Sequence, residues 1–312
     1  MKRLQKKIII IALIFVMLFI ACDIFNPPSN PYSDKILFTS SRSGKDQLYM
    51  MKSDGSEITQ ITNGEYGHSF GRWSPNADRI VCNTEEGYTT IGMPIAVFNS
   101  DGSNRIVLNP GSQMAWNPNG QSIVYIYNPS NEIGSNSEYI YTIDPDGGNL
   151  NKITNLEGEN LSSPCWSSDG EKIIFTSNRH NIENRNSLDI YKMDKDGSNI
   201  ERLTYTLNGK SYSVAVSNDG SKITFMSKLA DSIWASIYIS DIDGSNIQLV
   251  ASPIAGKIYN WPRWSPDDNQ ILFYAGNTTT PARHYIYMVN IDGTDLHKVI
   301  SDSSITSCDW SE

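Results

Sequence analysis

The stretch Thr306-Ser-Cys-Asp-Trp-Ser-Glu312, at the end of the 312-residue chain, decides the fold because it begins a repeat unit that it does not finish. Similar openings occur inside the chain, of which Trp73-Ser-Pro-Asn76 and Trp264-Ser-Pro-Asp267 are the clearest. Each internal copy leads into a full set of predicted strands, whereas the last copy stops two residues after Trp310. We therefore expect the missing strands to come from another part of the chain.

Two anchors recur along the chain and set the period of the repeat. The first is a Trp or Val that usually precedes a turn: Trp73, Trp116, Trp166, Val216, Trp264 and Trp310. The second is an Asp-Gly pair: Asp54-Gly55, Asp101-Gly102, Asp146-Gly147, Asp196-Gly197, Asp243-Gly244 and Asp292-Gly293. The 237 residues from Trp73 to Trp310 contain five intervals, so the mean period is 47.4 residues. Six copies at this spacing are typical of a propeller built from four-stranded blades.

Alignment on these anchors predicts the strands of each unit. A short apolar run indicates a strand buried on both faces: Ile36-Leu-Phe38, Ile80-Val-Cys82, Ile123-Val-Tyr125, Ile173-Ile-Phe175, Ile223-Thr-Phe225 and Ile271-Leu-Phe273. A third strand precedes each Asp-Gly pair, and its marker residues are Tyr49, Ala96, Tyr141, Tyr191, Tyr238 and Tyr287. The Asp-Gly turn then leads to a short fourth strand, because such turns favour tight hairpins.

The two ends of the chain complete one another in this scheme. Residues 36–62 supply strands two, three and four of a unit that lacks its first strand, and residues 303–310 supply a first strand without the rest. Pairing the two would close the ring and remove open sheet edges. We predict an all-β fold, a single six-bladed β-propeller of four-stranded antiparallel blades, closed by pairing of the C-terminal strand with the N-terminal blade.

The repeat unit resembles a known family. Trp166-Ser-Ser-Asp-Gly-Glu-Lys-Ile-Ile-Phe-Thr-Ser177, followed by Asp189-Ile-Tyr-Lys-Met-Asp-Lys-Asp-Gly-Ser198 and Glu201-Arg-Leu-Thr204, is similar to the TolB-type β-propeller repeat. The resemblance covers residues 34–312. It implies the propeller fold and is compatible with several functions.

The first residues are typical of a lipoprotein signal. A basic segment, Met1–Lys7, precedes the apolar run Ile8–Ile20, and Leu18-Phe-Ile-Ala-Cys22 resembles a bacterial lipobox, in which the Cys receives the lipid. We expect residues 1–21 to be a signal peptide, Cys22 to be the lipid attachment site, residues 22–33 to be a Pro-containing tether and residues 34–312 to be the propeller. The protein would then lie outside the cytoplasm, anchored to a bacterial membrane by N-terminal lipid.

The charge of the chain excludes one class of partner. Removing residues 1–21 deletes four positive charges and no negative ones, which takes the formal net charge from −9 to −13. An acidic body repels phosphate backbones, so we expect no nucleic-acid partner. We expect a monomer.

The sequence contains no nucleophile elbow, phosphate loop, HExxH or dinucleotide fingerprint. The Asp-x-Asp-Gly turns do not have the spacing of an EF-hand loop, so we interpret them as plain hairpin turns. Cys82, Cys165 and Cys308 give neither a disulfide framework nor a zinc motif. We therefore predict no catalytic residues, no metal site and no cofactor.

Candidate binding residues follow from the propeller geometry. The residue four positions before each Trp or Val anchor is polar, and we expect this column to line the central channel: Ser69, Ser112, Ser162, Tyr212, Asn260 and Thr306. His68, Tyr259 and Trp261 are expected around the same mouth. Long loops between the second and third strands would gather on one face and bring Arg179, Arg185, Trp234 and His284 there.

The favoured function is a non-catalytic scaffold that binds an envelope protein or peptide at its loop-bearing face. The alternative is a protein that acts on saccharides, either a binder or a metal-dependent enzyme resembling the oligogalacturonide lyases. Trp234, Tyr259 and Trp261 could stack on sugar rings in that case, and His68 with His284 could contribute to a metal site.

Overall fold

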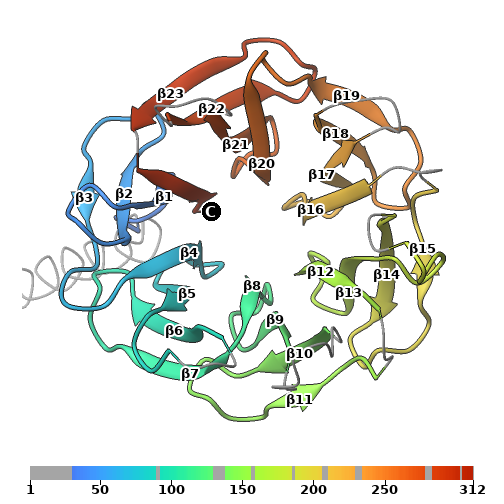
Figure 1. The fold of residues 1–312 in the computed structure, drawn as a ribbon, viewed down its shortest axis with the longest axis horizontal. Helices are drawn as coiled ribbons and strands as arrows, with labels where there is room; N and C mark the ends of the chain where they lie inside the picture. The colour runs from blue at the N-terminus through green and yellow to red at the C-terminus, as the bar shows by residue number, and fades with distance from the viewer. Residues whose placement is uncertain are drawn as a thin grey trace, which may run out of the picture. The chain divides into compact units, whose positions relative to one another are not determined.

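Six four-stranded antiparallel sheets form a closed ring in the computed structural model (Figure 1). The structure describes residues 30–88, 92–128, 138–155, 159–184, 187–205, 210–228, 234–277, 283–302 and 304–311. The chain divides into two compact units, residues 1–33 and 34–312, and the ring belongs to the second. Within the described ranges, no helix has the length and apolar character needed to span a bilayer.

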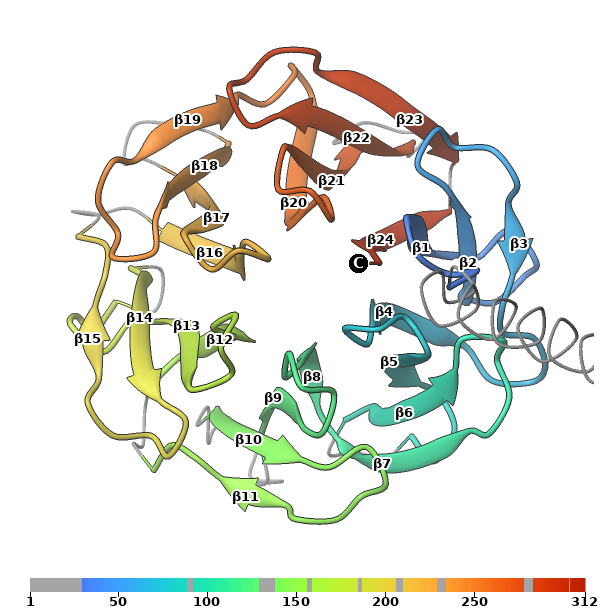
Figure 2. The ribbon, with the colours of Figure 1, turned by 180° about the vertical axis from the view of Figure 1, so that it is seen from behind.

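Each blade runs from an inner strand near the ring axis to an outer strand at the rim, as both views show (Figure 1, Figure 2). The inner strands are β4 (His68–Trp73), β8 (Ser112–Trp116), β12 (Leu161–Trp166), β16 (Lys210–Val216), β20 (Lys257–Trp264) and β24 (Ile305–Trp310). The second strands are β1 (Lys35–Ser40), β5 (Arg79–Thr84), β9 (Ile123–Tyr127), β13 (Lys172–Ser177), β17 (Lys222–Lys228) and β21 (Gln270–Asn277). The third strands are β2 (Gln47–Lys52), β6 (Pro94–Asn99), β10 (Tyr139–Ile143), β14 (Asp189–Asp194), β18 (Ser236–Asp241) and β22 (His284–Asn290). The outer strands are β3 (Thr59–Gln60), β7 (Ile106–Pro110), β11 (Asn151–Lys152), β15 (Glu201–Arg202), β19 (Gln248–Ala251) and β23 (His297–Asp302).

The last strand of the chain closes the ring, which confirms the predicted fold. β24 pairs with β1 in the order β24-β1-β2-β3, with Trp310 opposite Ile36 and Cys308 opposite Phe38. The hydroxyl groups of Thr39 and Ser307 lie 2.8 Å apart across the two strands. The ends of the ring are therefore joined by the same hydrogen-bond ladder that joins the strands within a blade.

Burial of the second strands explains why the apolar runs identify them. Ile36, Phe38 and Ile80 are at most 1% exposed, because each second strand lies between two others and between two neighbouring blades. Aromatic pairs stack across the second and third strands, as Phe38 does on Tyr49 with ring centroids 5.6 Å apart. The core thus consists of apolar layers between adjacent blades.

The Asp-Gly pairs form the hairpin turns between third and outer strands. In each turn an Asp carboxylate oxygen accepts the backbone N–H two residues later, at 2.8 to 2.9 Å: Ser56, Ser103, Gly148, Ser198, Ser245 and Thr294 are the donors. Gly55 has a φ of +82°, and a Cβ there would lie 2.8 Å from the carbonyl oxygen of Val299 in the adjacent blade. Both its backbone angle and the nearby blade require glycine. The turns are therefore structural, in agreement with the hairpin interpretation.

Candidate functional site

A cavity of about 690 Å³ follows the ring axis, and all six inner strands line it. Its walls combine hydroxyl and amide groups with Trp, Met and Val side chains. This volume lies in the range of sites that hold small molecules or short chain segments, which is roughly 300 to 1,000 Å³. We refer to this cavity as the central channel.

The pairing register shifts in all six inner strands. In five of them, all except β24, one residue other than glycine takes a φ between 51° and 56°: Phe70, Gln113, Ser163, Ser213 and Trp261. Such conformations are rare for residues with a Cβ, and bulges redirect side chains next to functional sites. All five residues line the central channel.

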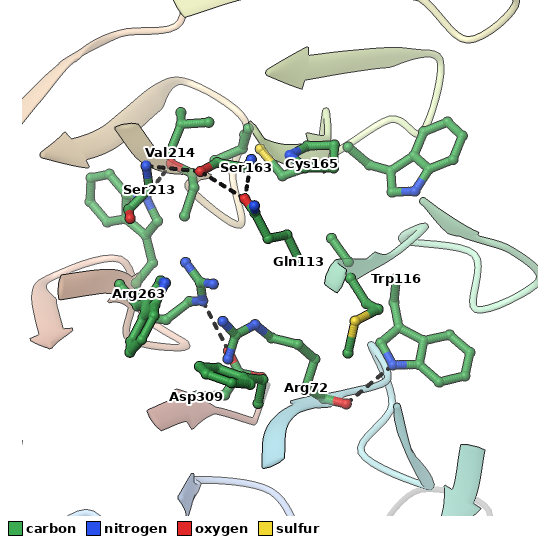
Figure 3. Close-up of a pocket in the computed structure, with 18 of the residues that line it drawn as sticks. Arg72, Gln113, Trp116, Ser163, Cys165, Ser213, Val214, Arg263 and Asp309 are labelled. Atoms are coloured by element: carbon green, nitrogen blue, oxygen red, sulfur yellow. Dashed lines mark hydrogen bonds and ion pairs between the residues drawn. The ribbon is translucent and has the colours of Figure 1, made fainter. Parts of the chain in front are cut away.

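Hydrogen bonds join the bulged residues of adjacent blades. The backbone N–H of Ser163 donates to Oε1 of Gln113 at 2.6 Å, and the backbone N–H of Ser213 donates to Oγ of Ser163 at 3.0 Å (Figure 3). On another part of the channel wall, the Phe70 and Trp261 rings meet edge to face at 5.2 Å. These contacts hold the bulges in place and set the width of the channel.

Charged side chains occupy one level of the channel, immediately before the Trp or Val anchors. The six residues at this level are Arg72, Ala115, Cys165, Ala215, Arg263 and Asp309. Nε of Arg263 lies 3.2 Å from Oδ1 of Asp309, whose Oδ2 accepts the backbone N–H of Trp73 at 2.9 Å. Nη1 of Arg72 donates to the carbonyl oxygens of Cys308 and Gly71, at 3.2 and 3.0 Å.

Arg72 is a buried cation. It is 9% exposed, and its pKa is lowered to about 10, mainly by burial and then by the nearby charge of Arg263. Because this pKa remains well above 7, Arg72 is positively charged at neutral pH. The Trp anchors help to fix this level, since Nε1 of Trp116 donates to the Arg72 carbonyl oxygen at 3.2 Å.

Five of the nine residues predicted at the mouth line the central channel. They are Ser112, Ser162, Tyr212, Asn260 and Trp261. Ser112 is exposed, and Ser162, Tyr212, Asn260 and Trp261 are partly buried. The polar column is therefore present along β8, β12, β16 and β20.

The other four predicted residues are absent from the channel wall, which corrects the sequence prediction. His68 is 1% exposed, with Nδ1 3.3 Å from Oε1 of Gln47, and burial lowers its pKa to about 4. Tyr259 is 0% exposed, and its hydroxyl accepts the Ile254 N–H at 3.1 Å. Both residues lie one position before the polar column, where strand alternation directs side chains between blades.

Ser69 and Thr306 do not line the channel wall, whereas the aromatic residues Phe70 and Trp261 do. Phe70 of β4 and Trp261 of β20 meet across β24, which lies between these two strands in the ring. Ser69 is 5% exposed, and the Thr306 hydroxyl is buried without a partner among the described residues.

The loop residues are engaged in local contacts. Arg179 lies 3.7 Å from Oε1 of Glu159, and His284 Nδ1 shares a short hydrogen bond with the Tyr274 hydroxyl. Trp234 is partly buried, and none of these side chains lines the central channel. Arg185 and Cys22 lie outside the described residues, as do parts of most of the long loops.

A polar cluster that the sequence analysis missed lies in the blade formed by β12, β13, β14 and β15. His180 Nε2 lies 3.1 Å from Oγ of Ser187 and 3.3 Å from Oδ2 of Asp189, while its Nδ1 lies 3.2 Å from the Tyr191 hydroxyl. A hydrolytic triad needs the nucleophile and the carboxylate on different ring nitrogens. Here both contact Nε2, so the cluster does not have triad geometry.

Metal-binding geometry is likewise missing from the part of the chain that the structure describes. No group of three or more His, Cys, Asp or Glu side chains there could hold an ion. His68 contacts Gln47 and Phe98, whereas His284 contacts Tyr274. Tyr259 is too deeply buried to stack on a sugar. The residues suggested for a lyase-like site therefore do not come together as one.

Comparisons with known proteins agree with this architecture. A family model described as the TolB beta propeller domain matches residues 115–312. An uncharacterized protein of Agrobacterium fabrum is 27% identical over 112 residues, which cover 32% of this chain and 38% of that protein. The match therefore spans less than half of that relative's length.

Solved structures share the fold at low sequence identity. TolB from Acinetobacter baumannii superposes with a TM-score of 0.73 at 19% identity, covering 90% of this chain and 67% of that one. An oligogalacturonate lyase in complex with manganese gives a TM-score of 0.58 at 16% identity, covering 85% of this chain and 73% of that one. At these identities the similarity concerns the arrangement of the blades.

Proposed function

The chain belongs to the TolB β-propeller domain family, and from this premise we propose that it is a non-catalytic scaffold that binds a protein or peptide segment of the cell envelope. The observation that supports this function most directly is the central channel. It offers about 690 Å³ of space at the axis of a rigid ring. Rigid scaffolds that enclose such a space are suited to binding.

The chemistry of the channel wall suits an extended peptide. A peptide in extended form presents one N–H donor and one carbonyl acceptor per residue, and each needs a partner when it leaves water. Ser112, Ser162, Asn260 and Gln113 offer hydroxyl and amide groups along the channel. Met114 and Val214 add apolar surface for side chains. The wall can therefore form hydrogen bonds with the backbone of a bound segment and apolar contacts with its side chains.

Blocking the channel should abolish binding. Ser112 is exposed at the channel wall, so Ser112→Trp would fill part of the space without burying a polar group. We expect partner recovery to fall by about tenfold or more, because a bulky side chain in a binding pocket excludes the ligand outright. The measurement is quantitative pull-down from solubilised membranes of the native host.

A matched variant separates blockage from a general effect of adding Trp. Gln248 lies exposed on β19, an outer strand, away from the channel wall. Gln248→Trp should therefore recover partners as wild type does. Equal recovery by wild type, Ser112→Trp and Gln248→Trp would exclude the channel as the binding site.

We further propose that the protein is an extracytoplasmic lipoprotein anchored through Cys22. The support is the basic and apolar N-terminal sequence with its lipobox-like Leu18-Phe-Ile-Ala-Cys22. A tether of this kind would hold a propeller in the aqueous phase beside a bilayer while leaving its channel accessible. This location also suits the proposed envelope partner.

Loss of the acceptor cysteine should release the protein from membranes. In Cys22→Ser no thiol remains to carry the lipid, so we expect either an unprocessed precursor or a soluble protein, with the processed membrane-bound form reduced at least about tenfold. Membrane fractionation and the mass of the mature N-terminus give the answer. Cys82→Ser is the matched control and should change neither, and unchanged anchoring of Cys22→Ser would refute lipidation at this residue.

A further inference from the structure

The charges that line the central channel do not balance. Five charged side chains contribute to its wall: Arg72, Glu138, Lys210, Arg263 and Asp309. Glu138 and Lys210 carry opposite charges. Asp309 is the single carboxylate near Arg72 and Arg263, and it forms an ion pair with Arg263. The channel wall therefore has a net charge of +1 in a chain whose formal net charge is −9.

The excess charge lies where water is scarce. Arg72 is 9% exposed, and the side chains of Arg263 and Asp309 are 19% and 10% exposed. A buried charge without a counter-charge is strongly destabilising, so such groups are normally paired. The positive charge of Arg72, which its lowered pKa leaves in place at neutral pH, is the unpaired member of the three.

Both guanidinium groups retain donors for a ligand. Among the described residues, the bonds of Arg72 use Nη1, and those of Arg263 use Nε to Asp309 and Nη1 to the Pro262 carbonyl oxygen. The Nη2 groups of both residues, and Nε of Arg72, donate to no other described residue. In Figure 3 the two guanidinium groups lie close together beside Asp309 and toward the cavity.

The opposite wall leaves room for a ligand. At the same level of the ring, the three inner strands β8, β12 and β16 carry Ala115, Cys165 and Ala215, whose side chains are short. The charged residues of this level, Arg72, Arg263 and Asp309, belong to the neighbouring strands β4, β20 and β24. One half of the channel thus presents positive charge, and the facing half leaves space.

We propose that this level of the central channel is a carboxylate subsite, in which Arg72 and Arg263 bind one carboxylate of the ligand and Asp309 holds the two guanidinium groups in position. The inference rests on the proposed function, since it specifies what the channel recognises in the segment that it binds. A carboxylate fits because its two oxygens match the planar fork of a guanidinium. Its single negative charge also balances the excess of +1, which a phosphate dianion would overcompensate.

The test uses small probes that contain the carboxylate in two chemical settings. N-acetylalanine represents the C-terminus of a peptide, and galacturonate represents an acidic sugar. Their neutral counterparts are N-acetylalaninamide and galactose. Binding is measured on the purified mature protein at constant ionic strength, by calorimetry and by the rise in unfolding temperature. We expect the carboxylates to bind and the neutral compounds to bind at least about tenfold more weakly.

Two variants change the affinity in opposite directions. Arg263→Met removes one guanidinium and should weaken carboxylate binding about tenfold. Asp309→Asn removes the competing negative charge while retaining an oxygen for the Trp73 N–H, and should strengthen binding about tenfold. Arg283→Met is the charge-matched control, because Arg283 is exposed and lies outside the channel wall, and it should bind as wild type does.

The outcomes separate this inference from the proposed function. Tighter binding of N-acetylalanine or galacturonate than of its neutral counterpart supports the subsite. The carboxylate that binds more tightly identifies the chemical class of the ligand. Equal binding of the neutral probes, or unchanged binding by a folded Arg263→Met, would overturn it, and this comparison stands even if Asp309→Asn does not fold. If carboxylates bind but Ser112→Trp still captures every partner, the subsite stands and the scaffold proposal fails. If the carboxylates bind no more tightly than the neutral probes but Ser112→Trp loses its partners, the scaffold proposal stands and the subsite is eliminated.

Discussion

A chain that lacks residues 304–312 should be unable to maintain the propeller. The deletion removes β24, including Ile305 and Cys308, which are both 0% exposed, and it leaves Phe38 of β1 without its strand neighbour. We expect a loss of about 5 kcal/mol or more, which is comparable to the entire stability of many domains. Circular dichroism and size-exclusion chromatography should show an unfolded or aggregated protein, because an open edge strand promotes association.

A circular permutant provides the control for this deletion. The backbone N–H of Ser311 donates to the Lys35 carbonyl oxygen at 2.9 Å, and the Lys35 N–H donates to Oγ of Ser311 at 2.7 Å. A short turn from residue 312 to residue 34 can therefore join β24 directly to β1. A chain running from Ser304 through this turn to Asp302 should fold and melt within about 5 °C of the native protein. Cooperative melting of the deleted chain at the native temperature would disprove the need for β24.

Asp189→Ala should produce the next largest loss of stability. Asp189 is 0% exposed, forms an ion pair with Arg202, and accepts a hydrogen bond from Oγ1 of Thr204 at 3.2 Å. Removing this carboxylate leaves the Arg202 guanidinium without its counter-charge. Because the Arg202 side chain is 24% exposed, we expect a cost of about 3 kcal/mol, at the lower end for buried pairs. Urea denaturation should show a lower midpoint with an unchanged slope.

Two further variants test the cause of that loss. Glu201→Ala removes an acid of the same blade whose side chain is 62% exposed, so it should cost less than about 1 kcal/mol. The double variant Asp189→Ala/Arg202→Met should recover part of the lost stability, because no charge then remains unpaired. A double variant that is less stable than Asp189→Ala alone would contradict this explanation.

The repeat pattern was sufficient to predict the ring, because each anchor reports a local requirement that every blade shares. Ile36-Leu-Phe38 must be apolar since two blades enclose it. Gly55 must be glycine since a Cβ there would lie 2.8 Å from the carbonyl oxygen of Val299. Ring closure could be predicted by counting strands. The segment near Trp310 supplies a first strand without a blade, the blade near Phe38 lacks its first strand, and the two pair in the structure.

The channel could be predicted only in part, because the bulges interrupt simple alternation. Gln113, Ser163 and Trp261 adopt positive φ although none is glycine, and sequence offers no direct signal for such a conformation. The edge contact between Phe70 and Trp261 on the channel wall joins residues 191 positions apart. The position of Arg72 and Arg263 before their Trp anchors suggests pairing with acids between blades, but it does not place them together with Asp309 on the channel wall. The three residues come together only after the ring has closed.

Closure by the final strand also determines the timing of biosynthesis. A polypeptide made from its N-terminus presents β1 long before Ile305–Trp310 has been synthesised, so the finished ring can form only after β24 has been made. During that interval β1 lacks its strand partner, and an unpaired strand edge promotes association. Loss of β24 should consequently be as harmful to the ring as loss of an earlier strand.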